Sequence, residues 1–116
     1  MRTDSVVLYE DPIYRIEKST SPPGLRLYGT FDIHARSILD RELEYGLRDG
    51  QDLYVDLSGL EFIDVRCMRT LLDVAAHLEL DGCRLVLLGP NLAVRRIIRL
   101  CREARPGNVD VFLRPA

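Results

Sequence analysis

Strand-like apolar runs alternate with amphipathic helical patterns along the chain, and this alternation restricts the folds open to it. Residues 53–57 (LYVDL) and 84–89 (RLVLLG) predict strands, and a helical pattern follows each of them. The second run is apolar without a break, as in a parallel strand covered on both faces, so we expect it at the centre of a sheet. The alternation predicts an α/β layer structure with right-handed crossovers.

Further strands are predicted at both ends of the chain. Residues 13–19 and 25–29 flank a turn at 21–24 and predict a hairpin. The run VVLY before them either adds an edge strand or belongs to a loose extension over residues 1–12. Residues 109–113 (VDVFL) predict the last strand.

Each of the three predicted helices has an apolar stripe. The first begins near Ala35 and ends near Asp49, the second follows Asp64 and ends near Gly82, and Asn91 caps the third. The stripes consist of Ala35, Leu39, Leu43, Gly46 and Leu47 in the first helix, Met68, Leu71, Leu72, Ala75, Ala76 and Leu78 in the second, and Ala93, Ile97, Leu100 and Cys101 in the third.

The length and composition predict one soluble domain over residues 1–116. Hydrophobic residues make up 47% and charged residues 29% of the chain, an ordinary globular balance. No apolar run approaches the ~18 residues of a membrane span, and the amino-terminal sequence lacks the features of a secretory signal. We therefore expect a cytoplasmic protein with no membrane contact.

Charge is distributed unevenly around a net value of −2. Residues 30–64 hold nine acidic residues against three arginines, whereas residues 91–105 hold five arginines against Glu103 alone. The overall acidity and the 7% of aromatic residues argue against nucleic acid as a partner. The basic residues of the third helix then decorate a solvated face: Arg95, Arg96, Arg99, Arg102 and Arg105.

No catalytic or metal site can be assembled from the reactive side chains. The three cysteines, Cys67, Cys83 and Cys101, are too widely spaced for a metal or redox motif, and neither histidine shares ligand spacing with them. Asp56 and Asp64 form a carboxylate pair without an accompanying histidine or lysine, so we expect structural roles for both. We predict no enzyme activity, no metal and no cofactor.

Three segments together resemble the STAS domain, the fold of anti-sigma factor antagonists and of the cytoplasmic tails of sulfate transporters. They read YGTFDIHA, LYVDLSGLEFIDVRCMRTLL and GCRLVLLGPNLAVRRIIRL, and the resemblance extends from about Leu25 to Val111. It implies a mixed, mostly parallel sheet of four to five strands flanked by three to four helices. The carboxy-terminal helix of many relatives has no counterpart before Ala116, which would bare a patch for a homodimer.

The family's phosphorylation motif is degenerate in this chain. Relatives usually read Asp-Ser-Ser/Thr-Gly-Leu where this chain has residues 64–68 (DVRCM), and the first serine is the one that is phosphorylated. Val65 stands at that position and has no oxygen to accept a phosphoryl group. The resemblance therefore implies a loop that occupies the family's position in the fold but cannot be regulated by phosphorylation at residue 65.

Arg66 is unusual because a cation in the first turn of a helix is unfavourable by about 0.3–1 kcal/mol at an exposed site. One explanation is a weak ion pair with Asp64 or Asp32. The other is a fixed positive charge that selects an acidic or phosphorylated partner.

The resemblance implies a non-enzymatic protein-binding module that resembles an anti-sigma factor antagonist. Its partner would be a GHKL-type kinase that acts as an anti-sigma factor, or a related regulator. The predicted partner-binding residues lie around the second helix: Asp32, Asp64, Val65, Arg66, Cys67 and Arg69. The alternative is a sensor domain, in which Cys67 reacts as a thiolate or Arg66 and the helix N-terminus bind a small anion.

Overall fold

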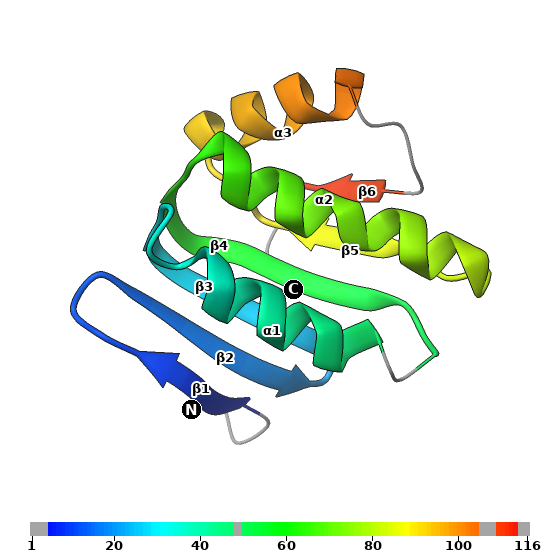
Figure 1. The fold of residues 1–116 in the computed structure, drawn as a ribbon, viewed down its shortest axis with the longest axis horizontal. Helices are drawn as coiled ribbons and strands as arrows, with labels where there is room; N and C mark the ends of the chain where they lie inside the picture. Colours follow the sequence, from blue (N-terminus) through cyan, green and yellow to red (C-terminus); the bar gives the residue numbers. More distant parts are fainter. Residues whose placement is uncertain (1–4, 48–49, 105–108, 114–116) are drawn as a thin grey trace.

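The computed structural model describes residues 5–47, 50–104 and 109–113. In these ranges six strands form one mixed sheet, in which every strand lies beside its neighbours in the sequence (Figure 1). The strands are β1 (Ser5–Glu10), β2 (Tyr14–Thr20), β3 (Pro23–Phe31), β4 (Leu53–Ile63), β5 (Leu85–Leu88) and β6 (Val109–Phe112).

The sheet has an antiparallel half and a parallel half. β1, β2 and β3 form an antiparallel meander, whereas β3, β4, β5 and β6 pair in parallel. The parallel strands are joined by α1 (Arg36–Leu47), α2 (Val65–Leu80) and α3 (Leu92–Ala104). Because these strands are added in one direction by right-handed crossovers, the helices lie on one face of the sheet, with α3 beside α2 (Figure 1).

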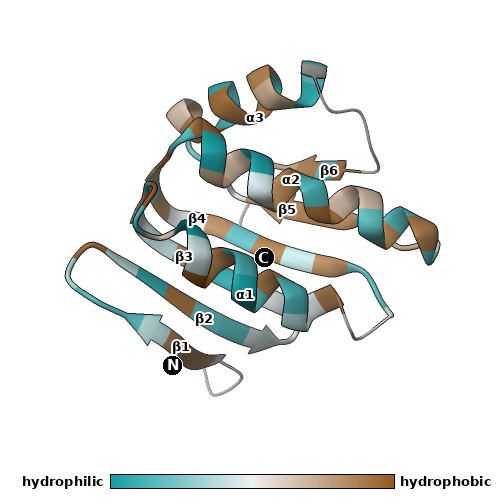
Figure 2. Cartoon of the chain, viewed as in Figure 1, coloured by the Kyte–Doolittle hydropathy of each residue, from teal (hydrophilic) through white to brown (hydrophobic). Residues whose placement is uncertain are grey.

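The core lies between this helical layer and the sheet. Its largest fully buried side chains include Phe31 from β3, Leu57 and Ile63 from β4, and Leu39 and Leu71 from the helices. Figure 2 shows β5 as apolar along its length, and all four of its residues are buried. Burial of this continuous apolar surface is the main favourable contribution to folding.

The α/β class and the mixed sheet are confirmed, but two details of the sheet prediction are wrong. The described residues form six strands rather than four to five, because VVLY is part of the edge strand β1. β5 is the second strand from the β6 edge rather than the centre of the sheet. The central strands are β3 and β4, and β4 continues to Ile63, well beyond the predicted end at residue 57.

The helical stripes are confirmed in α1 and, apart from the exposed Ala76, in α2, whereas the stripe of α3 is shifted. In α3 the buried residues are Val94, Ile98 and Cys101, while Ala93 and Leu100 are exposed. The expected end of the first helix at Asp49, together with Arg105 and Ala116, lies outside the described residues.

Gly29 occupies a position that a side chain would disrupt. Its φ is 88°, and a Cβ atom there would lie 2.2 Å from the carbonyl oxygen of Ile13. Gly82, which follows α2, has a φ of 71° but no heavy atom within 4 Å of an added Cβ. The two positions therefore separate the cost of the backbone conformation from the cost of a clash.

We expect Gly29→Ala to lower the free energy of unfolding by clearly more than Gly82→Ala. The Gly82 variant incurs only the conformational cost of about 1–2 kcal/mol, whereas the Gly29 variant must also move the backbone at Ile13. Urea denaturation of both variants measures the difference. Equal losses would show that the contact at Gly29 relaxes without cost.

Candidate functional site

The residues predicted to bind a partner lie at the edge of the sheet where the parallel strands end. We call this edge the loop end and define it as the residues that follow or close β3, β4 and β5: 32–34, 61–69 and 91–92. In Figure 1 it lies at the left, where α1, α2 and α3 all begin. The backbone N–H of Asp64 donates to the carbonyl of Phe31 at 2.9 Å and joins the ends of β3 and β4.

Asp64 is the N-cap of α2. Its backbone is extended, with φ −79° and ψ 169°, and its side-chain oxygen accepts the N–H of Cys67 at 2.8 Å. Its own carbonyl accepts the N–H of Met68 at 2.9 Å and begins the helical hydrogen bonds. The predicted cap is confirmed, so the Asp64 side chain satisfies one of the donors that an anion would otherwise use.

Cys67 links the two turns of the loop end. Its side chain is fully buried, and its thiol donates to the carbonyl of Asp32 at 3.1 Å. That carbonyl also accepts the N–H of Ala35, and the Asp32 carboxylate accepts the N–H of His34 at 2.9 Å. The structure thus brings Asp32, Asp64 and Cys67 together, with the thiol behind the surface rather than on it.

The environment of Cys67 opposes the form of the sensor alternative in which this cysteine reacts as a thiolate. Burial raises the pKa of its thiol to about 12, and the nearby carboxylates of Asp64 and Asp32 add to the effect, against a smaller opposing effect of Arg36. The sequence had suggested the opposite direction, because helix N-termini and arginines favour thiolates. Desolvation decides the direction here, since the thiol faces the core.

Arg66 and Arg69 are exposed on the first turns of α2. Within the described ranges, Arg66 forms no ion pair with Asp64 or Asp32, so the ion-pair explanation of this arginine finds no support. Val65 is the first residue of α2; it is half-buried and packs against the core. The surface of the helix start therefore combines an apolar side chain with two cationic ones.

A further contact, between α1 and α2, was not expected from the sequence. Thr70 is buried; its hydroxyl donates to the carbonyl of Arg66 at 3.1 Å and accepts from Nε of Arg36 at 3.3 Å. No local pattern could reveal this contact, because Arg36 and Thr70 lie 34 residues apart. It fixes the starts of the two helices relative to each other.

Exposed apolar side chains also lie at the loop end, and sequence reasoning missed them as well. Ile33 after β3, Phe62 at the end of β4 and Leu92 after β5 are 55%, 44% and 55% exposed. Apolar residues in the loops at this end are visible in Figure 2. The side chain of Asn91 donates to the carbonyls of Leu60 and Glu61, which holds Leu92 near the end of β4. Apolar residues just after strand ends were the available signal.

Asp56 and Asp64, the two carboxylates that the sequence places close together, do not form a pair in the structure. Asp56 accepts hydrogen bonds from the backbone N–H and hydroxyl of Ser58 and lies 3.8 Å from Arg26, whereas Asp64 caps α2. The two carboxylates thus have separate structural partners. The described part of the chain contains no cluster of residues that could hold a metal ion. None of its helices is long and apolar enough to span a membrane.

We expect Asp64→Ala to lower the free energy of unfolding by about 0.5–2 kcal/mol, because the N–H of Cys67 loses its acceptor. Asp64→Asn is the matched control, since asparagine caps equally well and removes only the charge. Thermal or urea denaturation measures both. A loss of the same size in both variants would assign the effect to the charge rather than to the cap.

The native protein should react very slowly with thiol reagents. With a pKa of about 12 for Cys67, only about one thiol in ten thousand is ionised at pH 8, and Cys83 and Cys101 are also buried. Titration with a chromogenic disulfide should therefore detect all three cysteines of the chain only after denaturation. Rapid labelling of Cys67 in the folded protein would revive the sensor alternative.

Comparison with solved structures places this fold among proteins that share little sequence with it. A putative anti-sigma factor antagonist from Thermotoga maritima has a TM-score of 0.61 at 18% identity, covering 76% of this chain and 77% of its own. The anti-sigma factor antagonist SpoIIAA, in its unphosphorylated form, has a TM-score of 0.55 at 23% identity, covering 66% and 71%. Apo-SiaC from Pseudomonas aeruginosa has a TM-score of 0.64 at 13% identity, covering 93% and 98%. At these identities the likeness establishes the fold.

Sequence comparison assigns the family. The comparison with curated proteins gives no match. A family model described as "Mlab, STAS domain" matches residues 14–105, which include β2 to α3 and the entire loop end. Because this match covers most of the chain and agrees with the mixed sheet, the chain belongs to the STAS domain family.

Proposed function

We propose that the chain is a non-enzymatic regulatory module that binds a protein partner through its loop end. The observation that carries this proposal is the start of α2, where half-buried Val65 and exposed Arg66 and Arg69 follow the N-cap residue Asp64. The resemblance to anti-sigma factor antagonists supports the same role. Two of the solved structures compared above are a putative anti-sigma factor antagonist and the anti-sigma factor antagonist SpoIIAA.

Some loop-end residues would contact the partner, and others hold the loops in position. Val65 offers an apolar contact, while Arg66 and Arg69 offer positive charge to an acidic or phosphorylated surface. Asp32, Asp64 and Cys67 hold the two turns in place through their internal hydrogen bonds. Ile33, Phe62 and Leu92 extend the apolar part of the surface.

Docking through this surface would be independent of phosphorylation at position 65. In relatives a phosphoserine there adds about −1.5 to −2 units of charge and drives release. Val65 accepts no phosphoryl group, and the nearby hydroxyl of Thr70 is buried and bound to Arg66 and Arg36. The module would thus act as a constitutive antagonist or scaffold.

The partner class that fits best is a cytoplasmic GHKL-type kinase that acts as an anti-sigma factor, as in the relatives that this chain resembles. Such a partner would present an acidic or apolar patch to the arginines and to Val65. A second copy of the chain is the competing partner, and the test must therefore include the protein alone.

The test is a binding titration of the protein with kinase-type anti-sigma factors from the same genome. We expect a stable complex, and we expect both Arg66→Glu and Val65→Asp to weaken it by about tenfold or more, because each places a negative charge in the contact. Arg99→Glu is the matched control, since Arg99 is exposed in the second half of α3, away from the helix start.

A second variant tests whether a hydroxyl group at position 65 restores regulation by phosphorylation. Val65→Ser restores the hydroxyl, and with a partner that is an active kinase it should become phosphorylated and release the complex that the wild type retains. Sedimentation of the protein alone tests self-association. The proposal fails if no such kinase binds, or if both loop-end variants bind as tightly as the wild type.

A further inference from the structure

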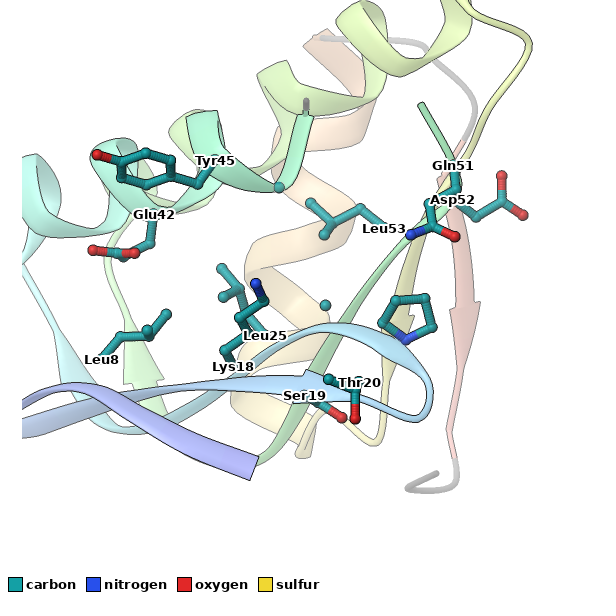
Figure 3. Close-up of a pocket in the computed structure, with 13 residues that line it drawn as sticks. Leu8, Lys18, Ser19, Thr20, Leu25, Glu42, Tyr45, Gln51, Asp52 and Leu53 are labelled. Carbon is teal, nitrogen blue, oxygen red and sulfur yellow. The ribbon is translucent and has the colours of Figure 1, made fainter. Parts of the chain in front are cut away.

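A cavity of about 690 Å³ lies at the edge of the sheet opposite the loop end (Figure 3). It is open to solvent on one side and bordered by the second half of α1, the hairpin between β2 and β3, and the start of β4. The docking residues follow the end of β4, whereas the cavity adjoins Leu53 at its start. Its volume lies within the range of about 300–1,000 Å³ that is typical of small-molecule sites.

The inner wall of the cavity is apolar. Leu25 and Leu53 contribute side chains from β3 and β4, and Leu8 and Pro23 line it further out. Figure 3 shows the side chain of Leu53 projecting into the space beneath α1. Gly46 gives α1 a surface without a side chain here, since an added Cβ would lie 3.0 Å from Leu53. An apolar chain or ring would be desolvated in this space.

Lys18 is the polar group that stands out in this wall. Along β2, Tyr14 and Ile16 are buried on the face that carries the helices, and the two-residue period of a strand places Lys18 on the same face. Figure 3 shows its amino group directed into the space between β2 and α1. Lys18 is the only lysine in the chain and forms no ion pair with the described residues. Its side chain is exposed, so the ammonium group is accessible to a ligand that enters the cavity.

The acidic groups of the wall are already engaged. Glu42 is buried and accepts from Nε and Nη2 of Arg41 at 3.0 and 2.9 Å. Asp52 accepts the backbone N–H of Arg84 at 2.9 Å. Both carboxylates keep their charge but already have partners, whereas Lys18 is the charged side chain of the lining that forms no ion pair with the described residues. A carboxylate ligand would form a charge-assisted hydrogen bond with it.

We propose that this cavity binds an amphipathic carboxylic acid, with the apolar body beneath α1 and the carboxylate on the amino group of Lys18. The side chain of Gln51 also lines the cavity, on the part of the wall near Leu53. The site is separate from the loop end and does not depend on the proposed docking function. Medium-chain fatty acids represent the ligand class.

The test is calorimetric titration with monomeric dodecanoate, below its micelle concentration. We expect one site per chain and a loss of affinity of about tenfold in Lys18→Gln, because a hydrogen bond to a charged group is removed. Dodecanol, which has the same chain without the charge, should bind the wild type and Lys18→Gln equally. Arg99→Gln, which removes a positive charge from exposed α3, should bind dodecanoate like the wild type.

The rate at which Lys18 is acetylated in the native protein gives an independent measurement of ligand binding. Because Lys18 is the only lysine, acetylation of a side-chain amine reports on this site alone. Dodecanoate should slow acetylation of Lys18 without slowing that of the α-amino group. The proposal is overturned if monomeric dodecanoate does not bind, if Lys18→Gln leaves its affinity unchanged, or if Lys18 stays unprotected. Binding to phospholipid vesicles without binding of the free acid would also overturn it.

Discussion

The hydrogen bonds of Asp64 are the constraint on which the loop end depends. Its N–H joins the ends of β3 and β4 through Phe31, its carbonyl begins α2, and its side chain caps the N–H of Cys67. One residue therefore fixes where the strand stops, where the helix begins and how the two strands align. An N-cap needs a short acceptor side chain on an extended backbone, and Asp64 provides both.

Cys67 forms a hydrogen bond that a glycine at the same position of the motif could not form. The position that relatives usually fill with glycine carries Cys67, whose side chain is fully buried and bonded to the carbonyl of Asp32. A glycine would leave that carbonyl with the N–H of Ala35 alone. The thiol of Cys67 therefore adds a hydrogen bond that joins the two turns of the loop end and restricts their relative movement.

The sequence was sufficient wherever the structure is decided locally. The stripes of α1 and α2, the cap at Asp64 and the class of fold all follow from spacing and residue type. The buried face of α3 was not predictable from the sequence. Its apolar residues Ile97, Ile98, Leu100 and Cys101 are compatible with more than one buried face, and tertiary packing determines which of them contact the core. β4 was predicted too short because irregular pairing with β3 interrupts the alternation after Asp56. The contact of Cys67 with Asp32 joins residues 35 apart, beyond any local pattern.

The cavity and the loop end lie at opposite ends of β4, an 11-residue strand, so roughly 30 Å separates them along the sheet. α1 extends along the same direction and contacts both regions: Arg36 at its start binds Thr70 of α2, and Glu42 and Gly46 in its second half line the cavity. β4 is held on both sides by β3 and β5, whereas α1 is joined to the sheet through its flanking loops and side-chain packing. A ligand that displaced α1 would therefore also disturb the contact between Arg36 and Thr70 at the other end of this helix.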